Sequence, residues 1–133
     1  MMMKNCKHNT DCGLLLIRLV LGVVFVAHGV MKFQAMPQII GFFGSLGFPP
    51  AVAYLVAFVE TFGGLAMLLG MFTDVAGVLL AVTMLVAIVK VKFSHGLVGG
   101  YEFELVLLVV ALAIACAGPG RYAVMKHHSQ PQQ

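Results

Sequence analysis

The chain has 133 residues, of which 61% are hydrophobic and 10% are charged, and its mean hydropathy is +1.02. A soluble domain of this length could not cover so much apolar surface, so we predict an integral membrane protein surrounded by a lipid bilayer. The formal net charge of +3 comes from Lys and Arg residues gathered at the ends of apolar segments, which indicates membrane orientation and argues against nucleic-acid binding.

The first apolar segment covers about residues 12–33 and follows a polar N-terminal tail at residues 1–11. Its length matches the hydrocarbon core of a bilayer. It is too long for a signal peptide and lacks a convincing small-residue cleavage site, so we expect it to be retained as the first span. Residues 34–50 are mixed in character and interrupted by prolines, which predicts a short interfacial or re-entrant helix.

The three further spans cover about residues 51–71, 75–91 and 101–117. The turn at residues 72–74 is tight, whereas the loop at residues 93–100 is rich in glycine. Gly118-Pro119-Gly120 ends the last span. The mostly polar residues 124–133 predict a disordered tail. The predicted membrane domain therefore covers residues 12–123. Four spans place both termini on one side, and the small Lys and Arg bias favours the cytoplasmic side of a plasma membrane.

Small residues recur at helical spacing within the spans. Such residues let helix backbones approach closely in lipid, so we predict an all-α protein whose four transmembrane helices form a compact bundle. The glycines expected at the helix contacts are Gly22, Gly29, Gly63, Gly64 and Gly77. The same stripes would also suit packing against a second copy of the chain, which leaves a homo-oligomer open.

Glu60 lies near the middle of the second span, where a charge is expensive and normally meets a partner inside the bundle. With a rise of about 1.5 Å per residue, Arg18 of the first span approaches a similar depth. We therefore predict a buried Arg18–Glu60 ion pair. The pair could serve only to fix the helix register, or it could belong to a pocket that holds a quinone or a small anionic substrate, or relays a proton.

A second polar layer is predicted on the side away from the termini. Its members are His28, Lys32, His95 and Glu102. The two histidines could exchange protons with a quinone or pair at a metal or haem, or they could simply be solvated, and nothing else in the sequence supports a metal. Glu102 begins the fourth span, where its charge also favours the helix dipole. Glu104 points about 200° away from Glu102 on a helix, so we expect an interfacial charge without a site role.

The three cysteines do not show standard zinc spacing, and a role as a thiol relay is an alternative interpretation. They are Cys6, Cys12 and Cys116. The sequence also contains no flavin, nucleotide, haem, iron–sulfur or metal motif. Any redox activity would therefore depend on redox partner proteins, and a quinone is the cofactor that the polar layers would suit.

Six short motifs follow one another along the chain. They are Arg18-Leu19-x-x-Gly22, His28-Gly29-x-x-Lys32-Phe33, Ser45-Leu46-Gly47-Phe48-Pro49, Glu60-x-x-Gly63-Gly64-x-x-x-x-Leu69-Gly70, Gly99-Gly100-Tyr101-Glu102 and Gly118-Pro119-Gly120-Arg121. As an ordered set they resemble the DoxX family, small bacterial inner-membrane proteins with four helices, over about residues 13–123. One departure is Asp74, where relatives often carry a basic or neutral residue.

The resemblance implies a role in membrane redox systems, since DoxX-like proteins include a thiosulfate:quinone oxidoreductase subunit in some archaea and members of oxidoreductase or thiol-stress complexes in some bacteria. It also implies that Glu102 lines the pocket. The leading hypothesis is a non-autonomous membrane subunit of a redox complex that binds a quinone or sulfur compound around Arg18, Glu60 and Glu102. The alternatives are a small-solute or lipid-binding transport protein, and a structural scaffold without chemistry of its own.

Overall fold

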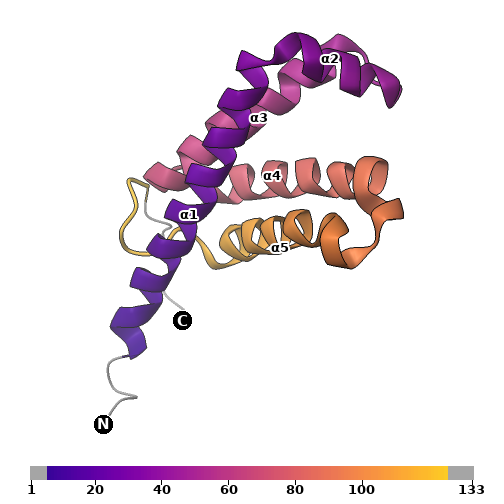
Figure 1. Ribbon diagram of the computed structural model, residues 1–133. Coiled ribbons are helices and arrows are strands. Elements are labelled where there is room, and N and C mark those ends of the chain that lie inside the picture. Colours follow the sequence, from indigo (N-terminus) through magenta and orange to yellow (C-terminus); the bar gives the residue numbers. More distant parts are fainter. Residues whose placement is uncertain (1–5, 126–133) are drawn as a thin grey trace.

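The computed structural model describes residues 6–125, with side chains described from Thr10 onward, and this part of the chain is helical almost throughout (Figure 1). The helices are α1 (Cys6–Gln34), α2 (Met36–Ser45), α3 (Pro50–Leu69), α4 (Thr73–Ala87), the π-helix η2 (Ile88–Lys92), the 3₁₀ turn η3 (Phe93–His95), the π-helical turn η4 (Leu97–Tyr101) and α5 (Glu102–Ala117).

Within the described residues, four helical segments are long and apolar enough to cross a membrane. They are Thr10–Gln34, Pro50–Leu69, Thr73–His95 and Leu97–Ala117. This confirms the predicted all-α fold with four transmembrane helices, and α2 is the predicted short helix between the first two spans. Of the two predicted tails, residues 1–5 and 126–133 lie outside the described residues, and α1 already begins at Cys6.

Proline and glycine set the ends of α3. Pro50 occupies the first position of the helix, where its missing N–H would have no helical acceptor in any case. Gly70 ends the helix with φ of 71°, a left-handed conformation that glycine adopts without steric penalty, and its N–H donates to the carbonyl oxygen of Ala66. These two signals make α3 a well-bounded span between short connections.

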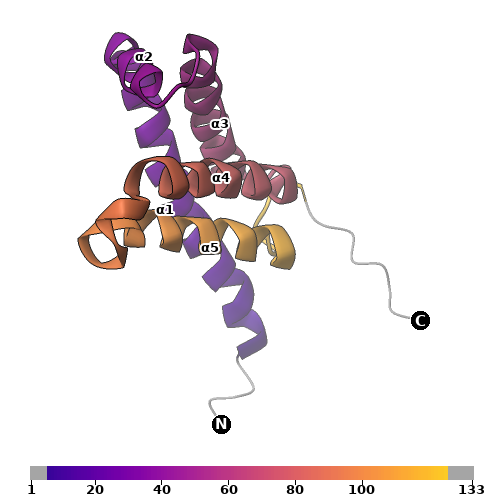
Figure 2. The ribbon, with the colours of Figure 1, turned by 90° about the vertical axis from the view of Figure 1, so that its right-hand side faces the viewer.

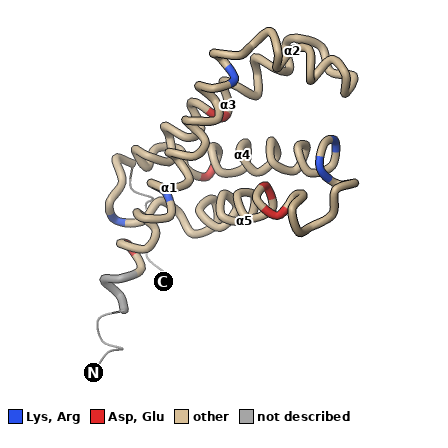
Figure 3. Tube along the Cα trace, in the orientation of Figure 1, with Lys and Arg blue, Asp and Glu red and all other residues tan. Residues whose placement is uncertain are grey.

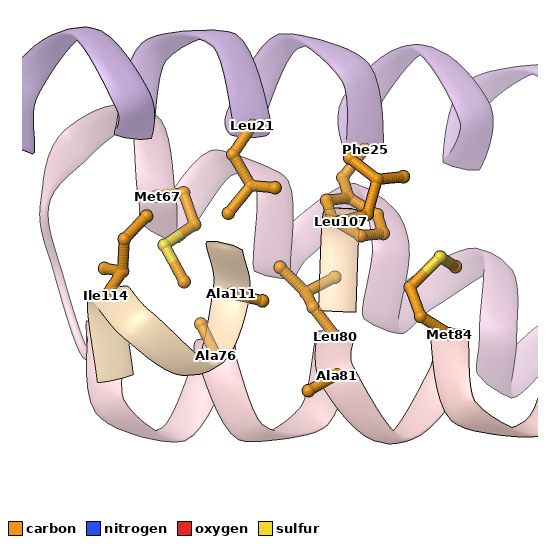
Figure 4. Close-up of a cluster of buried hydrophobic side chains, with 10 residues drawn as sticks. All are labelled: Leu21, Phe25, Met67, Ala76, Leu80, Ala81, Met84, Leu107, Ala111 and Ile114. Atoms are coloured by element: carbon orange, nitrogen blue, oxygen red, sulfur yellow. The ribbon is translucent and has the colours of Figure 1, made fainter. Parts of the chain in front are cut away.

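The four long helices form two antiparallel pairs, α1 with α3 and α4 with α5. Figures 1 and 2 show the two pairs crossing at a steep angle, with α2 lying across one end of the α1–α3 pair. Buried apolar side chains from all four helices meet where the pairs cross (Figure 4). They are Leu21, Phe25, Met67, Ala76, Leu80, Ala81, Met84, Leu107, Ala111 and Ile114.

Glycines bring the helices of each pair into backbone contact. A Cβ placed on Gly22 of α1 would lie 2.7 Å from the carbonyl oxygen of Gly64 in α3. In the other pair, a Cβ on Gly77 of α4 would lie 2.6 Å from the carbonyl oxygen of Ala111 in α5. Because real Cβ atoms do not come this close to a carbonyl oxygen, a larger residue at either glycine would push the helices apart.

Further glycines set the register and join the pairs. Gly29 of α1 packs against the backbone of Ala57 and Thr61 in α3, which continues the antiparallel register that starts at Gly22 and Gly64. Gly63 faces the other pair, because a Cβ on it would lie 3.0 Å from a side-chain carbon of Leu80 in α4. The α1–α3 register therefore fixes the height at which every polar residue of one helix meets the other.

We expect Gly22→Ala to lower the melting temperature of the detergent-solubilised protein, followed by circular dichroism. The added Cβ would lie 2.6 Å from Leu68 Cγ as well as against the α3 backbone, and overpacking of this kind typically destabilises by about 1–3 kcal/mol. Gly13→Ala is the matched control on the same helix, because a Cβ there meets nothing within 4 Å. Its melting temperature should stay the same or rise slightly. Equal melting temperatures for the two variants would contradict the close contact.

Candidate functional site

Arg18 is fully buried, and its hydrogen bonds go to backbone carbonyls. Nη1 donates to the carbonyl oxygen of Met67 at 3.0 Å, and Nη2 donates to the carbonyl oxygen of Tyr122. Met67 lies in the last turn of α3, where unsatisfied carbonyls carry partial negative charge. The guanidinium thus joins α1 to the end of α3 and to the segment that follows α5. The predicted Arg18–Glu60 ion pair is wrong.

Glu60 pairs with Lys32 instead. Lys32 Nζ lies 2.7 Å from Glu60 Oε2, and the Glu60 side chain is only 3% exposed. The antiparallel register explains this choice, because it places the start of α1 beside the end of α3 and the last turn of α1 beside the first half of α3. Arg18 is therefore level with Gly70, whereas the long Lys32 side chain reaches Glu60.

A second ion pair joins η2 to α5. Lys92 Nζ lies 2.6 Å from Glu104 Oε1, and Glu104 is 8% exposed. The other carboxylate oxygen, Oε2, is buried and has no hydrogen-bond partner among the described residues. The prediction that Glu104 is an interfacial charge is therefore wrong, because its side chain is buried. Glu102, by contrast, is exposed, and its Oε1 accepts a hydrogen bond from the Gly99 N–H at 3.1 Å.

Irregular backbone on both sides of the loop explains why Glu104 rather than Glu102 faces inward. The turn that presents Lys92 is π-helical, with a wider winding than an α-helix, and such turns are frequent at functional sites. After it, Val98, Gly99 and Gly100 depart from helical dihedral angles, so α5 starts afresh at Glu102. The rotation of α5 is thus set by the loop and by packing, not by continuation of the previous helix.

A cavity of about 560 Å³ lies between the two helix pairs, on the side where α2 contributes Phe42 and Phe43 to the wall. Its walls are mainly aliphatic and aromatic side chains from every long helix. The polar residues in its wall are His28, Lys32, Glu60, Thr83, Lys90, Lys92 and Glu104. Figure 3 shows basic and acidic residues adjoining on α1 and α3, and again where η2 meets α5. Both ion pairs therefore border one largely apolar cavity.

The remaining candidates divide between the cavity and the surface. His28 lines the cavity, with its ring centroid 6.1 Å from that of Phe103. His95 lies exposed in the turn η3 and does not line it, and neither do Arg18 and Glu102. Cys12 and Cys116 are free and exposed. The side chain of Cys6 lies outside the described residues.

Three charged residues of the cavity wall were not among the sequence-based candidates: Lys90, Lys92 and Glu104. Lys92 pairs with Glu104, and Lys90 Nζ lies 5.9 Å from the centroid of the Phe48 ring. A useful signal in the sequence is that two opposite charges flank the glycine-rich loop. Residues on either side of a loop between antiparallel helices lie close together, so Lys92 and Glu104 were suited to meet.

Comparison with known proteins decides the family. The DoxX family model matches residues 13–93, more than half of the chain, from α1 to the first residue of η3. The chain belongs to the DoxX family. This confirms the resemblance, and the matched part of this DoxX protein contains Lys32, Glu60 and Lys92, whereas Glu104 lies beyond it.

Two curated relatives support the assignment. CatD of Bacillus subtilis (strain 168), whose name describes it as a candidate oxidoreductase, is 40% identical over 108 residues, which cover 81% of each chain. Rv3486 of Mycobacterium tuberculosis (strain ATCC 25618 / H37Rv), named only as an uncharacterised membrane protein, is 32% identical over 130 residues, covering 86% of this chain and 80% of the relative. No solved structure gives a significant match.

We expect Arg18→Met to destabilise the protein, because the carbonyls of Met67 and Tyr122 would lose a charged donor in the interior. An unsatisfied buried polar group typically costs about 1–3 kcal/mol. The stability of Arg18→Lys should lie between that of the unmodified protein and that of Arg18→Met, since an ammonium group cannot span both carbonyls as a guanidinium does. Thermal unfolding in detergent measures the change. Arg121→Met is the control, because the Arg121 side chain is exposed and the hydrogen bond of Arg121 to Asp11 is donated by the backbone N–H, which the substitution keeps.

A double-mutant cycle distinguishes the observed ion pair from the predicted one. Lys32→Met and Glu60→Gln should each destabilise, and the double variant should lose much less than the sum, with a coupling of about 0.5–3 kcal/mol. Arg18→Met combined with Glu60→Gln should be nearly additive. Strong coupling of Glu60 to Arg18 and none to Lys32 would contradict the structure.

Proposed function

We propose that this DoxX protein is the membrane-embedded, ligand-binding subunit of a redox complex, and that a quinone binds in the cavity between the α1–α3 and α4–α5 pairs. The cavity is the observation that carries the proposal. Its volume of about 560 Å³ falls within the range of about 300–1,000 Å³ that is typical of small-molecule sites. Its apolar wall with a few polar groups also matches such sites.

The residues of the cavity fit the chemistry of a quinone. Aromatic side chains of α2 and α5, among them Phe43 and Phe103, offer faces against which a planar ring can pack. Lys32, Lys92 and His28 carry N–H groups that can donate to carbonyl oxygens. A bound quinone would supply electron and proton transfer. The chain itself would hold and orient the ring and place hydrogen-bond donors at its two ends.

The proposal makes the protein one part of a larger assembly. The chain has no motif for a flavin, haem, nucleotide or iron–sulfur group, so electrons would be exchanged with a partner protein that carries such a group. The description of CatD as a candidate oxidoreductase supports this class of function. We further propose a bacterial inner membrane with both termini in the cytoplasm, so that α2 and the η2–η4 loop lie on the opposite side.

Filling the cavity tests the proposal. In the purified protein, decylubiquinone should raise the melting temperature, since a ligand at one hundred times its Kd stabilises by about 2.7 kcal/mol. Val56→Trp places an indole at the cavity wall and should abolish this increase. Leu65→Trp is the control on the same helix, because Leu65 is 39% exposed and does not line the cavity.

The alternatives give different results in the same set of variants. If decylubiquinone stabilises neither the unmodified protein nor the Leu65→Trp control, the quinone proposal fails. Solute flux into proteoliposomes that Val56→Trp blocks would then indicate transport. A scaffold would show neither quinone binding nor flux.

A further inference from the structure

We infer that Glu104 selects the ligand of the cavity, and that this ligand carries a hydroxyl or N–H group that donates to Glu104 Oε2. The inference rests on the proposed function, in that the ligand must bind in this cavity. It adds the chemical class of the ligand: an amphipathic molecule with a hydrogen-bond donor at its polar end, such as an alkylphenol or a quinol.

The Glu104 carboxylate lies where η2 meets α5. Lys92 engages Oε1 at 2.6 Å, and Oε2 is buried without a partner among the described residues. Glu104 as a whole is 8% exposed and lines the cavity. Buried polar atoms are nearly always hydrogen-bonded, so an unpartnered oxygen on a residue of the cavity wall points to a group that arrives with a ligand as the carboxylate turns toward the cavity.

The free oxygen of Glu104 limits the kind of ligand group that can bind beside it. A carboxylate held by an ammonium group is an acceptor only, so its free oxygen needs a donor. A fully oxidised quinone presents only acceptors, so it could accept hydrogen bonds from Lys32, Lys92 or His28 in the same cavity but would leave Oε2 without a donor. A phenol or a quinol presents O–H groups, and a hydrogen bond to a charged acceptor is about twice as strong as a neutral one. The geometry therefore favours the hydroxylated form.

The two ends of the cavity differ in polarity, and this difference sets the orientation of the ligand. Lys92, whose side chain is 41% exposed, marks the wetter end of the cavity, and Glu104 lies beside it in the first turn of α5. Leu107, one turn further along α5, and Met84 of α4 continue the cavity wall with apolar surface. The donor would bind at the η2–α5 end, and the apolar body would extend between the two helix pairs.

A matched pair of probes tests the inference without redox chemistry. 4-Nonylphenol carries one hydroxyl, and 4-nonylanisole replaces its hydrogen with a methyl group. On the purified full chain in detergent, with affinities taken from concentration-dependent shifts in melting temperature, the phenol should bind about 10- to 100-fold more tightly, the value of one hydrogen bond to a charged group. Glu104→Gln should reduce this ratio by about tenfold.

Glu102→Gln is the control, because Glu102 is exposed, lies in the same helical turn and does not line the cavity, so the ratio should not change. Equal affinities for both probes, each abolished by Val56→Trp, would overturn the inference while leaving the cavity proposal intact. Binding of neither probe, together with no response to decylubiquinone, would overturn both proposals.

If Glu104→Gln does not fold, the ratio of phenol to anisole affinity in the unmodified protein still tests the inference, because a ratio near one refutes the requirement for a donor on the ligand. An unchanged preference in a folded Glu104→Gln variant would refute the role of Glu104.

Discussion

Charged groups inside a lipid bilayer must find their partners within the protein, because the hydrocarbon offers none. The buried charges of this protein's described residues meet this constraint in two ways. Arg18 donates to carbonyls at the end of α3 and beyond α5, whereas Glu60 and Glu104 each pair with a lysine. These contacts specify partners, which apolar stripes cannot do alone, since lipid tails are as apolar as the helices. The polar contacts therefore reinforce the register that the glycine contacts set between α1 and α3, and they join η2 to α5.

The cavity follows from how the two helix pairs are assembled. Within each pair, glycine contacts such as Gly22 with Gly64 keep the backbones close, so little space remains between partner helices. Between the pairs, larger side chains such as Leu80 and Phe25 fill the crossing point. Because the pairs cross steeply (Figure 2), their ends separate away from that point. On the α2 side this separation leaves the cavity.

Hydropathy was sufficient to predict the four spans and the short helix between the first two, because the bilayer sets span length. The pairing of charges was not predictable in the same way. Arg18 binds backbone carbonyls, which every residue possesses, so no residue type in the sequence marks its partners. The choice between Glu102 and Glu104 depends on the rotation of α5, and the non-helical dihedral angles at Val98–Gly100 change that rotation. Ideal helical spacing along the sequence does not predict such a change in rotation.

Stability alone does not explain Glu104. The α4–α5 pair already has backbone contact at Gly77 and Ala111, with Ala81 and Leu107 buried nearby, so the helices do not need an ion pair to associate. Buried ion pairs are often no more stabilising than apolar side chains of the same size, and an unsatisfied buried oxygen adds a penalty of about 1–3 kcal/mol. A carboxylate that serves only packing would be expected to have both oxygens paired. The unpartnered Oε2, on a residue of the cavity wall, is therefore better explained by a ligand than by the fold.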